Sequence, residues 1–382
     1  MPRIAFLLVF LILPVTCVAV DRSPTEPSPA RASANRPEPV ATTGGQIRTR
    51  QRQKQASSNA SPILPGEYQP VEYLLISWHD ELDTFLLDII EATWNQAKLV
   101  IVIPPELSAD DIAAELRTRD LRPEEVEHIV QGPINSPWIR DFGPIVVRTG
   151  DQRVLLDAHY YPGAPEDGVP RVLASAIWPQ WATAELPIRL DGGNLLSDGT
   201  GRCFTTAGYP AEVLESRLEE DRPVDVEVLT RELRERVGCR ELFILPPLLD
   251  ESTGHVDMYL TLTGPGRALV GAYAVADDRL NALRLDAVAS ILQRAGVSVE
   301  RVPMPDHWDD RFRTHTNALA VNNVVLVPVF PEIATDEARV LAIFKRAYPG
   351  REVIPIVSSD AIELEGAVHC ATATIAAIPR VR

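Results

Sequence analysis

Residues 73–103 read YLLISWHDELDTFLLDIIEATWNQAKLVIVI. The segment opens and closes with short runs of mainly aliphatic residues, 73–77 and 99–103, which are typical of β-strands. Between them, residues 80–96 place apolar side chains at the spacing of a helix. A strand, a helix and a second strand in succession indicate an α/β fold.

The same alternation continues through the rest of the chain. Further helices are predicted over residues 109–116, 279–295 and 336–347, and further strands over 297–302 and 352–356. No Pro/Gly/Ser-rich linker divides residues 67–382, so we expect one large folded domain.

Two predicted hairpins interrupt this alternation. Residues 318–321 and 324–327 flank Asn322-Asn323, and asparagine tolerates the positive φ of a tight hairpin turn. Residues 194–197 and 203–206 flank a four-residue turn in the same way. Because antiparallel pairs mix with crossover helices, a plain doubly wound sheet is disfavoured. The chain also lacks the GxGxxG and GxxxxGK[ST] patterns of dinucleotide and P-loop sites.

The N-terminus predicts export to the periplasm or the medium. Arg3 precedes the apolar run 4–13, and the small residues Cys17 and Ala19 suit a signal-peptidase site, so residues 1–19 are predicted to be a signal peptide. The alternative is that a lipid-modified Cys17 anchors the exported protein. No later segment has the pattern of a membrane span.

Residues 20–66 are predicted to be a disordered linker before a catalytic domain over residues 67–382. Residues 21–66 contain seven prolines and no aromatic residue, and seven basic side chains outnumber three acidic ones. Because the whole chain has a formal net charge of −16, the domain must be strongly acidic. This charge disfavours nucleic-acid partners and favours cationic substrates.

Four segments concentrate polar residues beside predicted strands. They read WIRDFGP at 138–144, DGGN at 191–194, GHVD at 254–257 and EGAVHC at 365–370. In an extended segment, His255 and Asp257 would point to one face while Val256 packs behind them. The two side chains would then share a site. The alternative is a hydrogen bond that only satisfies a strand edge.

Cys370 is a candidate nucleophile, provided that neighbouring groups lower the pKa of its thiol. The alternative is a buried structural cysteine. His369 is expected to be exposed or structural, because adjacent side chains of an extended segment point apart. The distant His255 is therefore the predicted partner for proton transfer.

Asp141 and Asp257 together would suit a planar cation. Two carboxylates that face a guanidinium form charge-assisted hydrogen bonds, and Trp138 could stack on its plane or on its alkyl stem. The alternative for Asp141 is a turn cap paired with Arg140. A thiol, an imidazole and two carboxylates indicate chemistry on a guanidino group.

The motifs also resemble those of a known family. WIRDFGP, LDGGNLLSDGTG, GHVD, HTNALAVNN and GAVHC occur in the order and spacing of the agmatine deiminase and bacterial peptidyl-arginine deiminase family. The resemblance covers about residues 68–379. It implies a pentein fold, a five-bladed α/β propeller in which five ββαβ modules form a single domain around a central polar site.

The resemblance assigns roles to individual residues. It places the nucleophile on Cys370, the general acid/base on His255 and the guanidinium-binding carboxylates on Asp141 and Asp257. Asn317 matches a position that supports the active site in peptidyl-arginine deiminases, and Asp191 stands where agmatine enzymes usually have glutamate. The predicted catalytic residues are Cys370, His255, Asp257 and Asn317, and the predicted substrate-binding residues are Asp141, Trp138, Arg140 and Asp191.

The predicted activity is hydrolysis of peptidyl-arginine or arginine to a ureido product and ammonia, through a covalent cysteine intermediate and without a metal or cofactor. Export favours this substrate, as does the absence of a glycine-rich run before Cys370. The alternative substrate is agmatine, whose deimination yields N-carbamoylputrescine. Arg153 and Arg171 are candidates for binding the carboxylate of a peptide.

Other classes remain as rivals. Amidino transfer to an amine would use the same covalent intermediate, and a secreted binder of cationic peptides would use the carboxylates alone. A papain-like protease is disfavoured because His255 and Asn317 precede Cys370, and a zinc hydrolase because no HExxH occurs. Cys203 and Cys239 could pair in an oxidising compartment.

Overall fold

The computed structural model describes residues 60–161, 163–206, 226–333 and 335–378, all of them in one compact unit. The predicted signal peptide and residues 20–59 of the predicted linker lie outside the described residues, so both assignments stay predictions. Within the described ranges, no helix is long and apolar enough to cross a bilayer.

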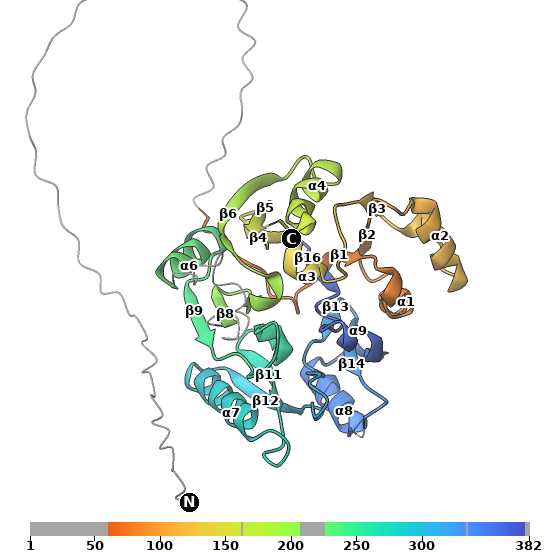
Figure 1. Ribbon diagram of the computed structural model, residues 1–382. Coiled ribbons are helices and arrows are strands. Elements are labelled where there is room, and N and C mark those ends of the chain that lie inside the picture. Colours follow the sequence, from red (N-terminus) through yellow and green to blue (C-terminus); the bar gives the residue numbers. More distant parts are fainter. Residues whose placement is uncertain (1–59, 162, 207–225, 334, 379–382) are drawn as a thin grey trace, which may run out of the picture. The chain divides into compact units, whose positions relative to one another are not determined.

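Five small sheets repeat one strand pattern. In each sheet the first strand pairs antiparallel with the second, and the second pairs parallel with the third. Figure 1 shows the five sheets in a ring around a common centre. This arrangement confirms the predicted propeller of five ββαβ modules.

The strands divide among the sheets as follows. The first sheet, in spatial order, contains β16 (Thr372–Ala376), β1 (Val71–Ser77), β2 (Lys98–Ile103) and β3 (His128–Gln131). The other four contain β4 (Ile145–Thr149), β5 (Gln152–His159) and β6 (Ala182–Arg189); β7 (Leu196–Ser197), β8 (Arg202–Thr206) and β9 (Glu241–Leu245); β10 (Leu260–Gly264), β11 (Arg267–Ala272) and β12 (Ser298–Pro303); and β13 (Leu319–Val321), β14 (Val324–Val329) and β15 (Glu352–Val357).

Each module has a helix between its second and third strands. These helices are α1 (Asp83–Ala92), α4 (Val169–Ala176), α6 (Val226–Glu232), α7 (Arg279–Arg294) and α8 (Glu337–Ala347). Shorter elements lie in the connections: α2 (Ala109–Thr118), α3 (Ile139–Phe142), α9 (Ser359–Glu363), the 3-10 turns η1 (Asp80–Leu82), η2 (Pro123–Glu125), η3 (Pro165–Gly168), η4 (Gly192–Asn194) and η6 (Val256–Met258), and the π-helical turn η5 (Leu233–Val237).

The first sheet shows why the segment 73–103 specifies this fold. Leu74 and Ile76 of β1 pack in one core cluster with residues of α1, whereas Tyr73 and Leu75 pack in another with Trp178. Side chains of a strand alternate between its two faces, so a continuous apolar run fills both cores. The strand is therefore buried on both sides.

The two chain ends of the domain meet in this sheet. β16, the last strand of the chain, is the first strand of the module that also contains β1 and β2. β16 and β1 pair antiparallel. Asn322, in the turn between β13 and β14, also accepts a hydrogen bond from Val71 N and donates one to Val71 O. The last module is thus bonded to the first, which closes the ring.

Both predicted hairpins are present. β13 pairs with β14 across Asn322, whose φ is 48°, and β7 pairs with β8. The predicted helix 80–96 is shorter than expected, because a 3-10 turn at Asp80–Leu82 precedes α1 and the helix ends at Ala92. The other predicted strands and helices agree with the structure to within two residues at their ends.

The folded chain begins before residue 67. Ile63 N donates to Arg148 O and Arg148 N donates to Ile63 O, each at 2.9 Å, and Ser197 Oγ donates to Leu64 O at 2.8 Å. The predicted boundary is therefore too late, because the aliphatic side chain of Leu64 at the end of the proline-rich segment packs on a core cluster.

Cys203 in β8 and Cys239 just before β9 form a disulfide. The two strands are parallel neighbours, and the Cα atoms are 5.4 Å apart. A disulfide is typical of proteins that fold in an oxidising compartment. Export of this protein stays a prediction.

Replacing both Cys203 and Cys239 with alanine is expected to lower the free energy of unfolding by about 3–4 kcal/mol, because the crosslink closes a long loop in the unfolded chain. Unfolding in urea measures the loss. Adding a thiol reductant to the unmodified protein should cause a similar decrease, and an unchanged midpoint with reductant would contradict the assignment.

Candidate active site

The polar residues predicted from the motifs lie in equivalent parts of the five modules. Each of them lies in the connection between the third strand of one module and the first strand of the next. The five connections carry, in order, Asp141; Asp191; His255 and Asp257; Asn317; and His369 and Cys370. The pseudo-symmetry of the ring therefore gathers residues that are as much as 229 positions apart in the sequence.

Cys370 lies immediately before β16 and is 4% exposed. It is the free cysteine of the described ranges. Its Sγ lies 3.2 Å from Asn317 Nδ2 and 3.9 Å from Asp257 Oδ2. Burial, together with the negative charges of Asp257 and Asp141, raises the pKa of the thiol well above its usual value. The condition named for a nucleophile, neighbouring groups that lower the pKa of the thiol, is not met by Asp257 and Asp141, which act in the opposite direction.

Asn317 connects the cysteine to the carboxylate. Its Nδ2 donates to both Cys370 Sγ and Asp257 Oδ2, at 3.2 and 3.1 Å. Its Oδ1 accepts from the backbone N–H groups of His369 and Cys370, at 2.9 and 3.2 Å. A fully buried amide with both ends engaged fixes the position of the thiol relative to the carboxylate.

Asp257 has two distinct oxygens. Oδ2 accepts hydrogen bonds from Asn317 and from the Nδ1 of His369, the latter at 2.7 Å. Oδ1 is buried and accepts no hydrogen bond from any residue that the structure describes. A buried carboxylate oxygen without a donor is costly, so it is a natural acceptor for a donor on a bound ligand.

His255 and Asp257 reach the site in a way that differs from the prediction. The segment is not extended, because residues 256–258 form the 3-10 turn η6, with His255 at its N-cap. Val256 packs behind the turn in a core cluster, as predicted. In the loop just before the turn, Glu251 accepts hydrogen bonds from the N–H groups of Thr253 and Gly254.

His255 lies between two carboxylates. Its Nε2 is 3.1 Å from Asp191 Oδ2, and its Nδ1 is 3.6 Å from Asp141 Oδ1. Burial lowers the pKa of the imidazole, but the charges of Asp141, Asp191 and Asp257 outweigh this and raise it to about 10. His255 is therefore an imidazolium at neutral pH and can donate a proton.

Gly193 occupies the centre of this group. A Cβ on residue 193 would lie 2.6 Å from Asp141 Oδ1, 2.9 Å from His255 Nδ1 and 3.1 Å from Asp257 Oδ2. The three side chains therefore converge on one small space, which only glycine leaves open. Gly193 N also donates to Asp141 Oδ1 at 3.1 Å.

Asp141 has the most unusual carboxyl of the group. Burial and the charges of Asp191 and Asp257 raise its pKa to about 7, although His255 acts in the opposite direction. Its helix, α3, is held against the cysteine because Arg140 N donates to Cys370 O at 3.1 Å. A cation placed beside Asp141 would favour its charged form.

Asp191 contacts protein groups rather than open space. Besides His255, it accepts a hydrogen bond from the hydroxyl of Tyr161 at 3.1 Å. This places Asp191 behind the histidine, where it orients the imidazole. Tyr161 belongs to none of the motifs, and the sequence held no signal for it.

Arg140 is not placed to bind a substrate, contrary to the prediction. Its guanidinium forms an ion pair with Glu67, and its Nε donates to His369 O at 3.4 Å. The pairing with Asp141, considered as the alternative, is also wrong. Trp138 packs on Gly366 and on a core cluster, so its stacking on a substrate remains a prediction.

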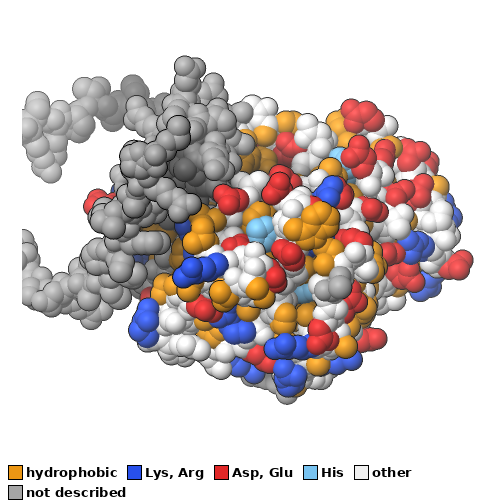
Figure 2. All heavy atoms as spheres, turned by 60° about the horizontal axis from the view of Figure 1, so that its bottom comes forward, with side chains coloured by type: hydrophobic (Ala, Val, Ile, Leu, Met, Phe, Trp, Pro, Cys, Tyr) orange, Lys and Arg blue, Asp and Glu red, His pale blue; other side chains and the backbone are white. Residues whose placement is uncertain are grey.

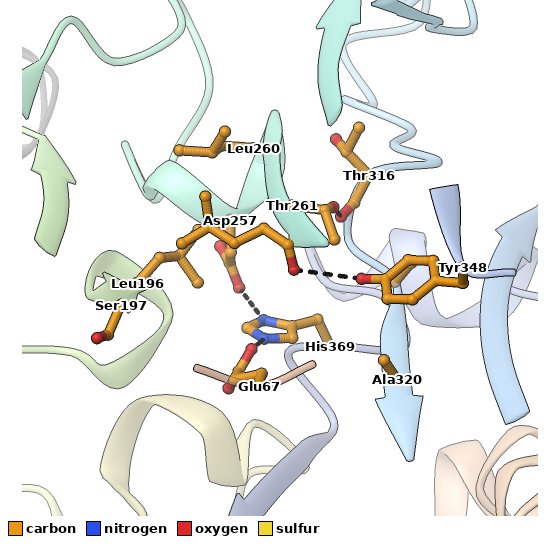
Figure 3. Close-up of a pocket in the computed structure, with 12 residues that line it drawn as sticks. Glu67, Leu196, Ser197, Asp257, Leu260, Thr261, Thr316, Ala320, Tyr348 and His369 are labelled. Carbon is orange, nitrogen blue, oxygen red and sulfur yellow. Dashed lines mark hydrogen bonds and ion pairs between the residues drawn. The ribbon is translucent and has the colours of Figure 1, made fainter. Parts of the chain in front are cut away.

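His369 and Glu67 belong to the site, although sequence reasoning did not place them there. Figure 3 shows the His369 ring between Asp257 and Glu67. Its Nε2 is 2.6 Å from Glu67 Oε2, and the residue is 4% exposed. Of the two expectations for His369, exposed or structural, exposure is wrong, because the chain is not extended here and turns back on itself from Ala367 to Ala371.

Comparison with known proteins gives a consistent result. The sequence model of the Porphyromonas-type peptidyl-arginine deiminase family matches residues 63–375. The agmatine deiminase of Pseudomonas aeruginosa is 26% identical over 361 residues, which cover 81% of this chain and 94% of that protein.

Solved structures show the same fold. The agmatine deiminase of C. jejuni superposes with a TM-score of 0.68 at 17% identity, over 84% of this chain and 97% of that one. A cysteine-to-serine variant of the C. jejuni enzyme, solved with its substrate bound, superposes with a TM-score of 0.64 at 16% identity, over 82% and 96% of the two chains. These likenesses support the pentein fold.

Replacing Gly193 with alanine is expected to abolish binding of a small guanidino compound, because the added methyl group would fill the space between Asp141, His255 and Asp257. Titration calorimetry with agmatine measures the binding. Gly168→Ala is the matched control, because a Cβ there would meet only Pro133 Cγ at 3.3 Å. Undiminished binding by the Gly193 variant would show that the ligand lies elsewhere.

Proposed function

The chain belongs to the Porphyromonas-type peptidyl-arginine deiminase family, and we propose that it hydrolyses agmatine to N-carbamoylputrescine and ammonia. Members of this family hydrolyse C–N bonds of linear amidines. The observation that carries the proposal is the free Oδ1 of Asp257, held by the same network of hydrogen bonds that fixes the Cys370 thiol.

A guanidinium suits this geometry. It is planar and cationic, and it presents N–H donors in pairs to carboxylates. Asp257 Oδ1 supplies an acceptor, and Asp141 supplies a carboxylate that ionises readily once a cation lies beside it. The carbon of the bound group would then face the sulfur of Cys370.

Agmatine fits better than the peptidyl-arginine that the sequence favoured. The solved relative with bound substrate is an agmatine deiminase, as is the Pseudomonas relative. Both predicted carboxylate-binding residues are engaged elsewhere: Arg153 pairs with Glu72, and Arg171 pairs with Asp157 and Asp167. A substrate without a carboxylate needs no such cation.

The surface charge is compatible with a cationic substrate. The face in Figure 2 shows acidic and basic side chains interspersed, with acidic ones most numerous toward the right of the view. The excess of acidic residues in the whole chain would raise the local concentration of a dication such as agmatine.

The proposed reaction has two halves. As the guanidinium binds, its positive charge favours the thiolate of Cys370, whose proton leaves to solvent, and the sulfur attacks the guanidinium carbon. The imidazolium of His255 donates a proton to the departing nitrogen, the C–N bond breaks, and ammonia leaves an amidino-thioether.

Neutral His255 then accepts a proton from a water molecule as the water oxygen attacks the same carbon. In the collapse of this adduct the C–S bond breaks as the C=O bond forms, and the remaining hydroxyl proton passes to solvent. The thiolate is returned and the ureido product is released. Asp141 and Asp257 hold the guanidino nitrogens through both halves, so the reacting atoms stay aligned.

Ureido product formation is expected to be fastest with agmatine. Purified protein is assayed colorimetrically with agmatine, free arginine and a peptide ending in arginine at equal concentrations. We expect a kcat/KM for agmatine at least tenfold higher than for the other two. A clear preference for the peptide would instead assign the second candidate, peptidyl-arginine deimination.

The covalent route predicts that Cys370→Ala loses at least 10⁴-fold in kcat, because no other group supplies the nucleophile. Mass spectrometry of acid-quenched wild-type protein should show an amidino adduct on the Cys370 peptide. Ammonia release without an added amine separates hydrolysis from amidino transfer. Retained turnover in the purified variant would rule out the route.

A further inference from the structure

A chain of charged groups runs from the Cys370 site to the start of the folded domain. Asp257 Oδ2 contacts His369 Nδ1 at 2.7 Å, and His369 Nε2 contacts Glu67 Oε2 at 2.6 Å (Figure 3). Arg140 pairs with the other oxygen of Glu67. The proposed reaction uses neither His369 nor Glu67, although both are ionisable, His369 contacts the carboxylate of Asp257 that would bind the substrate, and Glu67 contacts His369.

We propose that Glu67 and His369 are positioning residues, which hold Asp257 with its Oδ1 turned to the substrate and place a fixed cation on Asp257 Oδ2, the carboxylate oxygen 3.9 Å from Cys370 Sγ. This inference rests on the proposed function for the identity of the substrate. The position of the His369 imidazolium follows from its contacts and does not depend on the substrate.

The geometry restricts Asp257 to one orientation. His369 and Asn317 both donate to Oδ2, so rotation of the carboxyl would break two hydrogen bonds to buried donors. Oδ1 is thereby kept for the ligand. The His369 ring cannot turn away, because Glu67 holds its second nitrogen and the His369 N–H is bound by Asn317.

Charges support an imidazolium at this place. The charged groups that face His369 are Glu67, Asp257 and Arg140. Burial and Arg140 lower the pKa of the ring, and the two carboxylates raise it further than that. Burial raises the pKa of Glu67, but Arg140 and His369 lower it to about 2, so Glu67 is an anion at neutral pH.

The His369 imidazolium affects how readily the Cys370 thiol ionises. Asp257 Oδ2 contacts the His369 ring and also lies 3.9 Å from Cys370 Sγ. The charges of Asp257 and Asp141 disfavour a thiolate, and an imidazolium on the same oxygen offsets part of this effect. Without it, a smaller fraction of Cys370 would be ionised at any given pH.

Alkylation of Cys370 by iodoacetamide tests this directly, because only the thiolate reacts and no substrate is needed. The rate is measured on the full-length protein between pH 7 and 9 by mass spectrometry of the Cys370 peptide. His369→Asn keeps an N–H donor for Asp257 but removes the charge, and Glu67→Gln keeps an acceptor for the ring. We expect about tenfold slower alkylation in His369→Asn and a smaller decrease in Glu67→Gln.

The direction of the change separates this role from a merely structural one. Loosening of the site would expose a buried thiol and speed its alkylation, whereas loss of a fixed cation slows it. Glu185→Gln is the matched control, because Glu185 forms a 2.8 Å pair with His159 on the surface, and its rate should equal that of the unmodified protein.

An unchanged or faster rate in both variants would overturn the inference. Should His369→Asn fail to fold, Glu67→Gln alone decides the outcome by the same criterion. Slower alkylation in a protein that does not turn over agmatine would support the positioning pair and reject the proposed substrate, so the two failures are distinguishable.

Discussion

The site depends on the balance of buried charge. Three aspartates lie close together, Asp191 and Asp257 buried and Asp141 with a side chain that is 11% exposed, and their mutual repulsion must be offset. Two imidazolium groups do so, His255 between Asp141 and Asp191, and His369 between Asp257 and Glu67. The remaining excess of negative charge is the property that selects a cation.

The same balance would allow a cysteine with a raised thiol pKa to act as the proposed nucleophile. Burial and the nearby carboxylates raise the pKa of the Cys370 thiol, so only a small fraction of it is thiolate at neutral pH. A guanidinium would add positive charge beside the thiol and beside Asp141, whose pKa His255 lowers only in part. Binding and activation would thus be one event, since the substrate supplies the charge that its own attack requires.

Much of the site could be read from the motifs. Cys370, His255, Asp141, Asp257 and Asn317 do converge, because each lies in a connection that the five-module ring brings to its centre. Arg140, His369 and Glu67 could not be placed, because their roles come from contacts between distant connections. Glu67 in particular lies in no motif, at the edge of a segment whose composition indicates a linker.

Sequence by itself determined the classes of structure and chemistry. Apolar runs form strands such as β1 and β2, and Asn322 lies in a hairpin turn as predicted. The motif residues supply a thiol, imidazoles and carboxylates. Tertiary structure alone decided which oxygen of Asp257 is free, which histidine lies between which carboxylates, and that two arginines are engaged away from the site. The physical reason is the distance along the chain between the residues that interact. Strand and turn preferences act between neighbouring residues, whereas the charge state of a buried group depends on partners that only the closed ring brings within a few ångströms.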